Sequence, residues 1–313
     1  MPVKIVNCKE ISREEWLEYR RAGIGGSDAA VIVGLNPWRS LSELYADKLG
    51  LLPDKEDNEQ MRIGRDLEEY VARRFCEATG KKVRRNNWMF HKSGNANLTA
   101  NVDREIVGEN AGLECKTTSA FAKSDFENGQ IPLYYYCQCV HYMNVMGYDR
   151  MYLAVLVLGR SFYWYTIERN EDEINALETA ENGFWLHHVI PEIPPAGDGS
   201  ESAEKATAAI FGAKETLEPV SLFPADDRVA EYLRLQAESK ALEKQANAVK
   251  ESIQAFLNGA QIGKSDRYFV SWRETESTRV DTKALKEKYP QVYAAVAKTS
   301  TARRFIAKEI VNE

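Results

Sequence analysis

A short turn bounded by glycines, residues 108–112, separates two β-prone stretches, residues 97–106 and 111–117. Because so few residues join the two stretches, we expect them to fold back on each other as antiparallel strands. Helical patterns lie on both sides of this pair along the chain. The sequence therefore predicts an α/β fold in which a sheet is flanked by helices.

Charged residues lie at one end of this predicted strand pair. Side chains alternate across a strand, so Glu114 and Lys116 share one face. Leu113 and Cys115 then point into the core. If Asp103 ends the first strand, the turn brings its carboxylate to Glu114, where both can bind one cation. Two carboxylates can hold Mg²⁺ for phosphodiester hydrolysis and a lysine can orient the attacking water, although such spacings also arise by chance.

A predicted helix over residues 60–79 supplies a third carboxylate. Its apolar residues recur at helical spacing and form a buried stripe, made of Leu67, Val71, Phe75 and Ala78. Glu68 lies at the edge of that stripe, whereas a helical advance of about 100° places Glu69 on the far side. Glu68 can therefore lean toward a site under the helix, and the alternative is an ordinary surface glutamate.

A second predicted helix, residues 133–147, carries Gln138 and Tyr142 four positions apart. Side chains at this spacing are neighbours on one helix face. An amide and a phenol there can hydrogen-bond a metal-bound water or a DNA backbone. They can equally form a satisfied pair in the core.

The order of these elements resembles the YqaJ and lambda-exonuclease branch of the PD-(D/E)XK nucleases. The matching elements are Gly-Arg-Asp-Leu-Glu at residues 64–68, Asp103, Glu-Cys-Lys at 114–116, and the run 138–142, which fits the Gln-x-x-x-Tyr motif of RecB-like nucleases. Residues 20–28 and 36–45 are similar to the opening segment of that branch. The resemblance covers roughly residues 12 to 190 and implies a restriction-endonuclease-like core with a mixed central sheet.

The resemblance also implies roles for single residues. The implied metal ligands are Asp103, Glu114, the backbone carbonyl of Cys115 and, directly or through water, Glu68. Lys116 would position the nucleophile and Gln138 would line the site. The implied cofactor is Mg²⁺, with Mn²⁺ as a substitute. Val140 departs from the pattern, because many relatives carry another glutamine there, and this leaves Gln138 unaffected.

A DNA-end site is implied by the opening segment. In lambda-type enzymes an arginine and a serine of this segment hold the 5′-phosphate, and the nearest matches are Arg21 and Ser27, with Arg20 as a substitute for Arg21. Residues 25–27 precede an apolar helical run, and free N–H groups at a helix start attract phosphate. An ordinary helix cap at Ser27 would fit the same pattern. Tyr142 is predicted to bind DNA beside them.

Composition sets limits that agree with this interpretation. The chain has 313 residues, of which 44% are apolar and 28% charged, an ordinary globular mixture. Its net charge of −6 argues against a uniformly basic DNA-coating protein. A nuclease is not excluded, because a channel can be basic while the outer surface is acidic.

Cysteine usage and hydropathy indicate the compartment. Five cysteines, an odd number without C-x-x-C spacing, favour a reducing setting. Charged residues interrupt the opening of the chain, so we expect no secretory leader. The apolar run 151–158 is far shorter than the ~20 residues that a bilayer helix needs. We therefore expect no membrane association and a cytoplasmic location, and the resemblance implies a phage or prophage origin in a bacterial host.

Residues 1–190 are predicted to form the exonuclease domain. The predicted helices are residues 12–20, 27–34, 40–49, 60–79, 133–147 and 171–188. The predicted strands are residues 82–91, 97–106, 111–117, 151–158 and 162–168. A linker is predicted over residues 191–225, because its first part is rich in proline, glycine and serine.

Residues 226–313 are predicted to form an appendage that begins with a long helix, Asp226 to Leu257. Apolar residues repeat there by sevens and form a coiled-coil-like seam of Tyr232, Ala246, Ile253, Leu235, Leu242, Val249 and Phe256. A hairpin of residues 267–272 and 277–280 follows, then short helices within 282–297 and a basic strand, 303–306. The seam could pair with another subunit, grip DNA, contact a partner protein or fold back on the nuclease core.

The predicted function is that of a Mg²⁺-dependent exonuclease that degrades one strand of linear double-stranded DNA, 5′ to 3′, for phage-type recombination. The resemblance implies a homo-oligomer, with ring-shaped trimers among lambda-type relatives, and a single-strand annealing protein as partner. The alternatives are an endonuclease or single-strand nuclease of the same fold and a non-catalytic DNA-end-binding scaffold protein. The intact set of Asp103, Glu114 and Lys116 argues against the scaffold.

Overall fold

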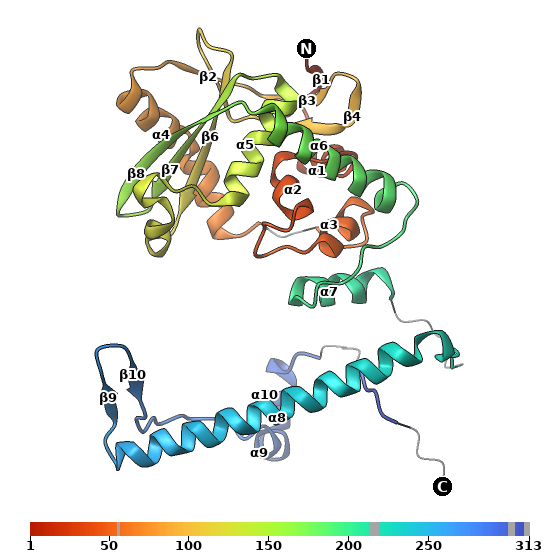
Figure 1. The fold of residues 1–313 in the computed structure, drawn as a ribbon, viewed down its shortest axis with the longest axis vertical. Coiled ribbons are helices and arrows are strands. Elements are labelled where there is room, and N and C mark those ends of the chain that lie inside the picture. The colour runs from red at the N-terminus through yellow and green to blue at the C-terminus, as the bar shows by residue number, and fades with distance from the viewer. Residues whose placement is uncertain (55–56, 213–218, 300–303, 310–313) are drawn as a thin grey trace. The chain divides into compact units, whose positions relative to one another are not determined.

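The structure is a computed structural model that describes residues 1–54, 57–212, 219–299 and 304–309. The chain divides into two compact units, Met1–Ala213 and Lys214–Glu313, which are described separately below (Figure 1). The elements of the first unit are, in order, β1 (Val3–Asn7), α1 (Arg13–Arg21), α2 (Gly26–Ile32), α3 (Leu41–Lys48), α4 (Glu59–Thr79), β2 (Val83–Arg85), β3 (Trp88–Lys92), β4 (Asn95–Ala100), β5 (Arg104–Ile106), β6 (Ala111–Thr118), η1 (Ala120–Gly129), α5 (Leu133–Met146), β7 (Arg150–Val157), β8 (Ser161–Glu168), α6 (Glu171–Phe184), η2 (Trp185–Val189) and α7 (Glu201–Ile210).

The first unit contains a five-stranded sheet in the order β2-β5-β6-β7-β8 and a three-stranded sheet in the order β1-β3-β4. In the larger sheet β6 and β7 run parallel, whereas the other neighbours are antiparallel. The central strand β6 therefore has one partner of each kind. This confirms the predicted mixed central sheet.

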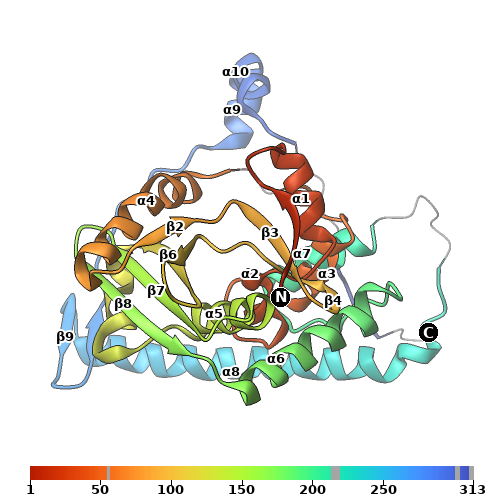
Figure 2. The same ribbon diagram turned by 90° about the horizontal axis from the view of Figure 1, so that it is seen from above.

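Helices cover both faces of the larger sheet (Figure 2). Helix α4 packs on one face, against β6 and β7, and buries Val71, Ala72 and Phe75 there. Helix α5 packs on the other face, and it also contacts α2, β3 and β4. A parallel strand pair inside a sheet needs such cover on both sides. The predicted α/β fold class, a mixed sheet flanked by helices, is confirmed.

Two of the predicted strands are each divided between sheets. The prediction of one strand over residues 97–106 is wrong, because β4 ends at Ala100 in the small sheet and β5 begins at Arg104 in the large one. The predicted strand 82–91 is likewise divided into β2 and β3. Asp103 thus lies just before β5 and does not end a strand, which changes how it reaches Glu114.

The first unit extends past residue 190, where the sequence predicts a linker. Helix α7 packs against α3, and its Ala203 and Ala206 are buried. The hydroxyl of Ser202 accepts a hydrogen bond from the backbone N–H of Ser40 at 3.0 Å. Small residues at 203 and 206 allow this close packing. The unit boundary therefore lies at Ala213, within the predicted linker 191–225.

The second unit begins with η3 (Phe223–Ala225) and the long helix α8 (Asp226–Leu257), and continues with β9 (Ile262–Lys264), β10 (Phe269–Ser271), α9 (Thr282–Lys288) and α10 (Pro290–Val296). The bounds of α8 agree with the prediction. The predicted hairpin is displaced: β9 pairs with β10, because Ser265 closes the turn by donating its N–H to Tyr268 O at 2.9 Å. Of the predicted basic strand, Arg303 lies outside the described residues and 304–306 form no strand.

The apolar seam of α8 is exposed: side chains such as Leu235, Leu242 and Val249 keep half or more of their surface. None of the helices in the described ranges combines the length and apolar character that crossing a bilayer requires.

Candidate active site

The point where β5 separates from β6 creates the site. The two strands pair through Arg104 with Leu113 and Glu105 with Gly112, and the pairing stops there. Beyond this point the N–H of Cys115 has no strand partner on that side, and it donates to the Asp103 carboxylate, Oδ2, at 2.8 Å. The side chain of Asp103 thus replaces the missing strand and lies beside the Glu114–Lys116 segment.

Glu114 and Lys116 share one face of β6, as predicted. Lys116 Nζ donates to Glu114 Oε1 at 2.6 Å, and Gln138 Nε2 from α5 donates to the same oxygen at 2.7 Å. The second oxygen, Glu114 Oε2, is buried and has no hydrogen-bond partner among the described residues. Leu113 lies in the core under α4, and Cys115 packs against it. The structure therefore gathers an acid, an amine and an amide and leaves one carboxylate oxygen unsatisfied.

The electrostatics around these groups favour a cation. Burial raises the pKa of Asp103 well above its usual value, and the neighbouring Glu114 carboxylate raises it further. Burial alone would lower the pKa of Lys116, but the charges of Glu114 and Asp103 outweigh burial and raise it. Two carboxylates share this space with one ammonium group, so ionising both leaves a deficit of positive charge.

The donors present suit Mg²⁺ or Mn²⁺. Such ions prefer carboxylate, carbonyl and water oxygens, and they use one or two carboxylates together with substrate phosphate. The unpartnered Oε2 of Glu114 and the enclosed Asp103 supply that chemistry. The described residues form no preassembled group of three or more Asp, Glu, His or Cys able to hold a metal ion.

Glu68 lies next to this pair but is held by other residues. Its Oε1 accepts a hydrogen bond from Arg104 Nη1, which also donates to the backbone oxygen of Asp103 at 2.7 Å. Arg85 approaches the same Oε1 at 3.5 Å. Glu68 is therefore a rim residue that belongs to an ion-pair group. Sequence reasoning missed Arg104, whose position directly after Asp103 on a buried strand was the available signal.

Gln138 and Tyr142 form the predicted pair on one face of α5, with 3.1 Å between Gln138 Nε2 and Tyr142 Oη. Both face α2 at Gly26. A Cβ atom at Gly26 would lie 2.6 Å from Tyr142 Cε1, so only glycine allows the helices to approach this closely. This contact joins the opening segment to the Glu114 face of the sheet.

A cavity of about 140 Å³ opens at this junction, and it is lined by Trp16, Arg20, Gly25, Gly26, Ser27, Met89, Thr99, Ala100, Asn101, Gln138 and Tyr142. Arg20 lies in it and donates to Ser27 Oγ at 2.9 Å. Arg21 instead pairs with Asp54 and lies 3.9 Å from Asp47. The structure thus brings together Arg20, Ser27 and Tyr142 and turns Arg21 away.

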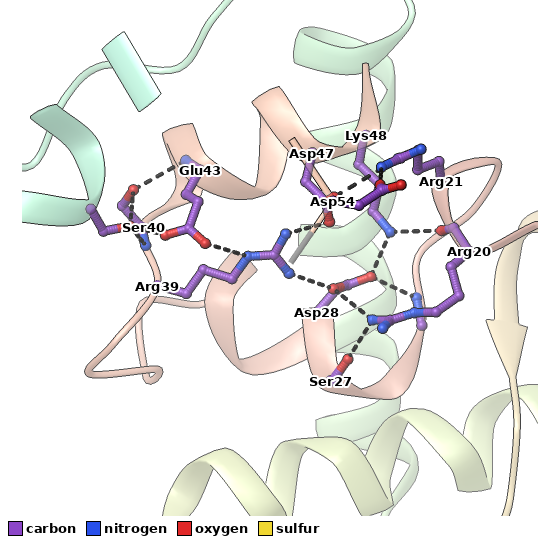
Figure 3. Close-up of polar contacts among 12 residues, drawn as sticks. Arg20, Arg21, Ser27, Asp28, Arg39, Ser40, Glu43, Asp47, Lys48 and Asp54 are labelled. Atoms are coloured by element: carbon purple, nitrogen blue, oxygen red, sulfur yellow. Dashed lines mark hydrogen bonds and ion pairs between the residues drawn. The ribbon is translucent and has the colours of Figure 1, made fainter. Parts of the chain in front are cut away.

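A buried charge cluster holds this segment in place (Figure 3). Asp28 is completely buried, and it accepts hydrogen bonds from Lys48 Nζ at 2.6 Å and Arg39 Nη1 at 3.1 Å. Lys48 also donates to the backbone oxygens of Arg20, at 2.9 Å, and Gly23, at 2.6 Å. Burial would raise the pKa of Asp28, but the charges of Lys48, Arg20 and Arg39 outweigh it and lower the pKa. Sequence reasoning missed this cluster.

Comparison with known proteins places the chain in a family. Residues 15–149 match the family described as the YqaJ-like viral recombinase domain. Over 305 residues, 96% of each chain, the sequence is 40% identical to the uncharacterized protein YqaJ of Bacillus subtilis (strain 168).

Two solved structures are also similar to the chain. An alkaline exonuclease, LHK-Exo from Laribacter hongkongensis, is 20% identical with a TM-score of 0.49, and the match covers 64% of this chain and all of that one. A phage-related exonuclease from Haemophilus somnus 129PT is 14% identical with a TM-score of 0.41, over 55% of this chain and 96% of that one. The ordered motifs, the matched domain and the identity along nearly the whole sequence lead to one conclusion: this chain is a member of the YqaJ-like viral recombinase family.

Proposed function

We propose that this chain is a Mg²⁺-dependent deoxyribonuclease, an exonuclease that hydrolyses one strand of linear double-stranded DNA in the 5′ to 3′ direction, with Mn²⁺ able to replace Mg²⁺. One observation carries the proposal: Glu114 has a buried oxygen, Oε2, without a hydrogen-bond partner among the described residues, its charge raises the pKa of the neighbouring Asp103, and Lys116 is bonded to its other oxygen. An incomplete pair of carboxylates next to an ammonium group fits phosphodiester hydrolysis.

Each residue of the site has a distinct task in this proposal. The ion would be held by Asp103, Glu114 and the backbone carbonyl of Cys115, and when bound it would polarise the scissile phosphate and acidify a water. Glu68, tied to Arg104, would contribute through water. Lys116 stays charged beside Glu114 and orients the attacking oxygen while stabilising the negative charge that develops on the phosphate.

Gln138 positions the side chain of Glu114 in this proposal. Its amide donates to Glu114 Oε1 and would hold that side chain in place, so that Oε2, which has no partner among the described residues, remains available to an ion. The amide also contacts Tyr142 Oη, so the hydrolytic site and the cavity around Ser27 share one residue. A DNA end held in that cavity would lie next to the reacting groups.

The proposed 5′-phosphate site consists of Arg20, Ser27 and Tyr142 in the cavity of about 140 Å³. Arg20 replaces the predicted Arg21, which is engaged by Asp54. A guanidinium and a hydroxyl within 2.9 Å of each other offer converging donors to a terminal phosphate. A preference for phosphorylated 5′ ends follows.

The direct test is digestion of end-labelled linear duplex and covalently closed circular duplex with Mg²⁺ or with EDTA. We expect release of 5′-terminal nucleotides from linear DNA with Mg²⁺, no release with EDTA, and no cutting of closed circles. Asp103→Ala and Lys116→Ala abolish release, whereas Asp66→Asn, which changes an exposed carboxylate on the same helix as Glu68, does not.

Other results would assign a different function. Equal cutting of linear and closed DNA would identify an endonuclease. Cutting of single strands alone would identify a single-strand nuclease. Binding of DNA ends with no hydrolysis in either metal, and no effect of Asp103→Ala, would identify a scaffold protein and contradict the proposal.

The second unit carries a surface that suits the predicted protein partners. The exposed seam of α8 can pair with a second copy of the chain or with a single-strand annealing protein, as the coiled-coil-like repeat suggests. We propose that it mediates self-association into a homo-oligomer, and the resemblance to lambda-type enzymes makes a trimer one form to test. Light scattering of the full chain and of Leu242→Asp measures this directly, and an unchanged mass in the variant would contradict it.

A further inference from the structure

A row of aromatic rings leads from the candidate active site to the surface. Lys116 Nζ lies 5.2 Å from the ring centroid of Tyr135. The ring of Tyr135 is 4.4 Å from that of Tyr134, which in turn meets the ring of Trp38 edge to face at 4.9 Å. We call Trp38, Tyr134 and Tyr135 the aromatic ledge. It joins the reacting ammonium group to an exposed indole.

The outer end of the ledge is open yet held in place. Trp38 keeps 67% of its surface exposed, although it is a large apolar side chain. Asn36 Oδ1 accepts hydrogen bonds from the backbone N–H groups of Trp38, at 2.9 Å, and Arg39, at 3.0 Å. Arg39 is itself bonded to the buried Asp28. The loop that carries the indole is therefore tied to the charge cluster of Figure 3, and the ring does not depend on its own burial for position.

The chemistry of the ledge suits bases better than phosphates. Its outermost side chain is a ring and not a cation, and the lysine that lines the same pocket as Trp38, Lys205, is paired with Glu201 at 2.6 Å. The phenols of Tyr134 and Tyr135 are neutral near pH 7 and do not repel a phosphate backbone that passes nearby. Aromatic faces bind successive bases of a single strand by stacking, with little dependence on sequence.

We propose that the aromatic ledge binds nucleobases of single-stranded DNA next to the scissile phosphate, with Trp38 as the outermost stacking residue. The proposal rests on the proposed nuclease function, because continuity with Lys116 is what favours a nucleic acid strand over a protein. The ledge guides the strand that enters or leaves the reaction centre and keeps its bases away from the complementary strand.

The test measures binding without hydrolysis. Fluorescence anisotropy in EDTA reports the affinity of the full chain for a fluorescein-labelled oligothymidylate and for an abasic strand of equal length, which has the phosphates but lacks the bases. Trp38→Ala is expected to weaken binding of the oligothymidylate roughly tenfold and to leave the abasic strand unaffected. Tyr134→Ala is expected to act in the same direction.

Side-chain replacements separate stacking from general apolar contact. Trp38→Phe keeps an aromatic face and restores most of the affinity, whereas Trp38→Leu does not. Trp164→Ala is the matched control, because Trp164 is 42% exposed and meets Phe75 edge to face, outside the ledge. Thermal unfolding of each variant verifies that it is folded.

Two outcomes would overturn the proposal. Unchanged oligothymidylate binding by Trp38→Ala would contradict base binding at the ledge, and equal rescue by Phe and Leu would exclude stacking. Asp103→Ala separates this proposal from the nuclease function. If the nuclease proposal fails, the unaltered chain does not hydrolyse DNA, yet Trp38→Ala still weakens oligothymidylate binding in EDTA. If the proposal for the aromatic ledge fails, Trp38→Ala leaves binding unchanged, yet Asp103→Ala still abolishes hydrolysis.

Discussion

Asp28 and Asp103 are carboxylates enclosed in the same unit, yet their surroundings shift their pKa values in opposite directions. At Asp28 burial opposes ionisation, but Lys48, Arg20 and Arg39 outweigh it, and the pKa is lowered. At Asp103 burial and the charge of Glu114 both oppose ionisation, and Lys116 offsets them only in part, so the pKa is raised.

The difference separates a part of the candidate site that is electrostatically complete from the part that we propose to be reactive. The Asp28 cluster is complete within the chain, because both carboxylate oxygens have cationic partners. The Asp103–Glu114 pair is incomplete, because Glu114 Oε2 has none among the described residues. A complete cluster holds the opening segment in place without needing a bound ion. An incomplete one has a deficit of positive charge that a bound cation can correct.

Neutralising the incomplete pair has the largest expected effect. Asp103→Asn and Glu114→Gln remove the charge that would hold the ion, so the rate of nucleotide release with Mg²⁺ is expected to fall on the order of a thousandfold. The measurement is release of end label under single-turnover conditions, with Asp66→Asn as control. If these variants release nucleotides at a rate within a few fold of the unaltered chain, Asp103 and Glu114 are not the carboxylates needed for hydrolysis.

Neutralising the complete cluster is expected to cost stability. Asp28→Asn leaves Lys48 buried without its counter-charge and removes one of the carboxylates paired with Arg39, so the free energy of unfolding should fall by about 3–5 kcal/mol. Urea unfolding at pH 7.5 measures this loss.

The same variant tests the pH dependence. Because the folded-state pKa of Asp28 is lowered, its contribution is present above the unfolded pKa of roughly 3.9 and is lost as pH falls through the folded value. Acid unfolding should therefore be less steep in Asp28→Asn. A variant as stable as the unaltered chain, with the same acid dependence, would contradict the structural role.

Divalent metal should stabilise the chain through the incomplete pair alone. A ligand present at about a hundred times its Kd adds about 2.7 kcal/mol to the free energy of unfolding. We expect Mn²⁺ to raise the melting temperature of the unaltered chain and of a folded Asp28→Asn, but not that of Glu114→Gln. A rise of equal size in Glu114→Gln would place the ion elsewhere.

The two neighbouring arginines should differ in their effect on DNA ends. Arg20→Ala is expected to remove the preference for 5′-phosphorylated over 5′-hydroxyl ends. The binding free energy lost should be roughly 1.5–3 kcal/mol, the contribution of one hydrogen bond to a charged group. Arg21→Ala should keep the preference, because Arg21 pairs with Asp54. Competition between the two kinds of labelled duplex end measures the ratio, and the reverse result would favour the assignment made from sequence.

The smallest expected effect is that of Asp103→Asn on stability, and its sign is opposite to that of Asp28→Asn. The raised pKa of Asp103 means that its ionised form destabilises the metal-free fold above that pKa. Asp103→Asn in EDTA at pH 8 should therefore be as stable as the unaltered chain or more stable, by about 1 kcal/mol or less. If Asp103→Asn instead lowers the free energy of unfolding by several kcal/mol, as expected for Asp28→Asn, both carboxylates stabilise the fold and the contrast between them is wrong.

Local patterns in the sequence were enough for part of this picture. The two-residue period of a strand predicted the common face of Glu114 and Lys116, and the helical period predicted the contact of Gln138 with Tyr142. The seven-residue repeat predicted the long helix α8. In each case the cause lies within a few residues along the chain.

Features that depend on distant neighbours were not predictable in this way. Arg20 and Arg21 are adjacent in α1, and only the folded positions of Ser27 and Asp54 determine which of them faces the cavity. The separation of β4 from β5 likewise depends on which sheet each segment joins. The Asp28 cluster brings together α1, α2, α3 and the loop between α2 and α3, and no single segment carries its signal.

Calorimetric titration of Mn²⁺ into the full chain and its variants tests the central claim most directly. The account predicts saturable binding to the unaltered chain and to Asp66→Asn, and its loss in both Asp103→Asn and Glu114→Gln. Binding that persists in both of these variants, or that is absent from the unaltered chain, would contradict the assignment of Asp103 and Glu114 as the carboxylates that hold the ion.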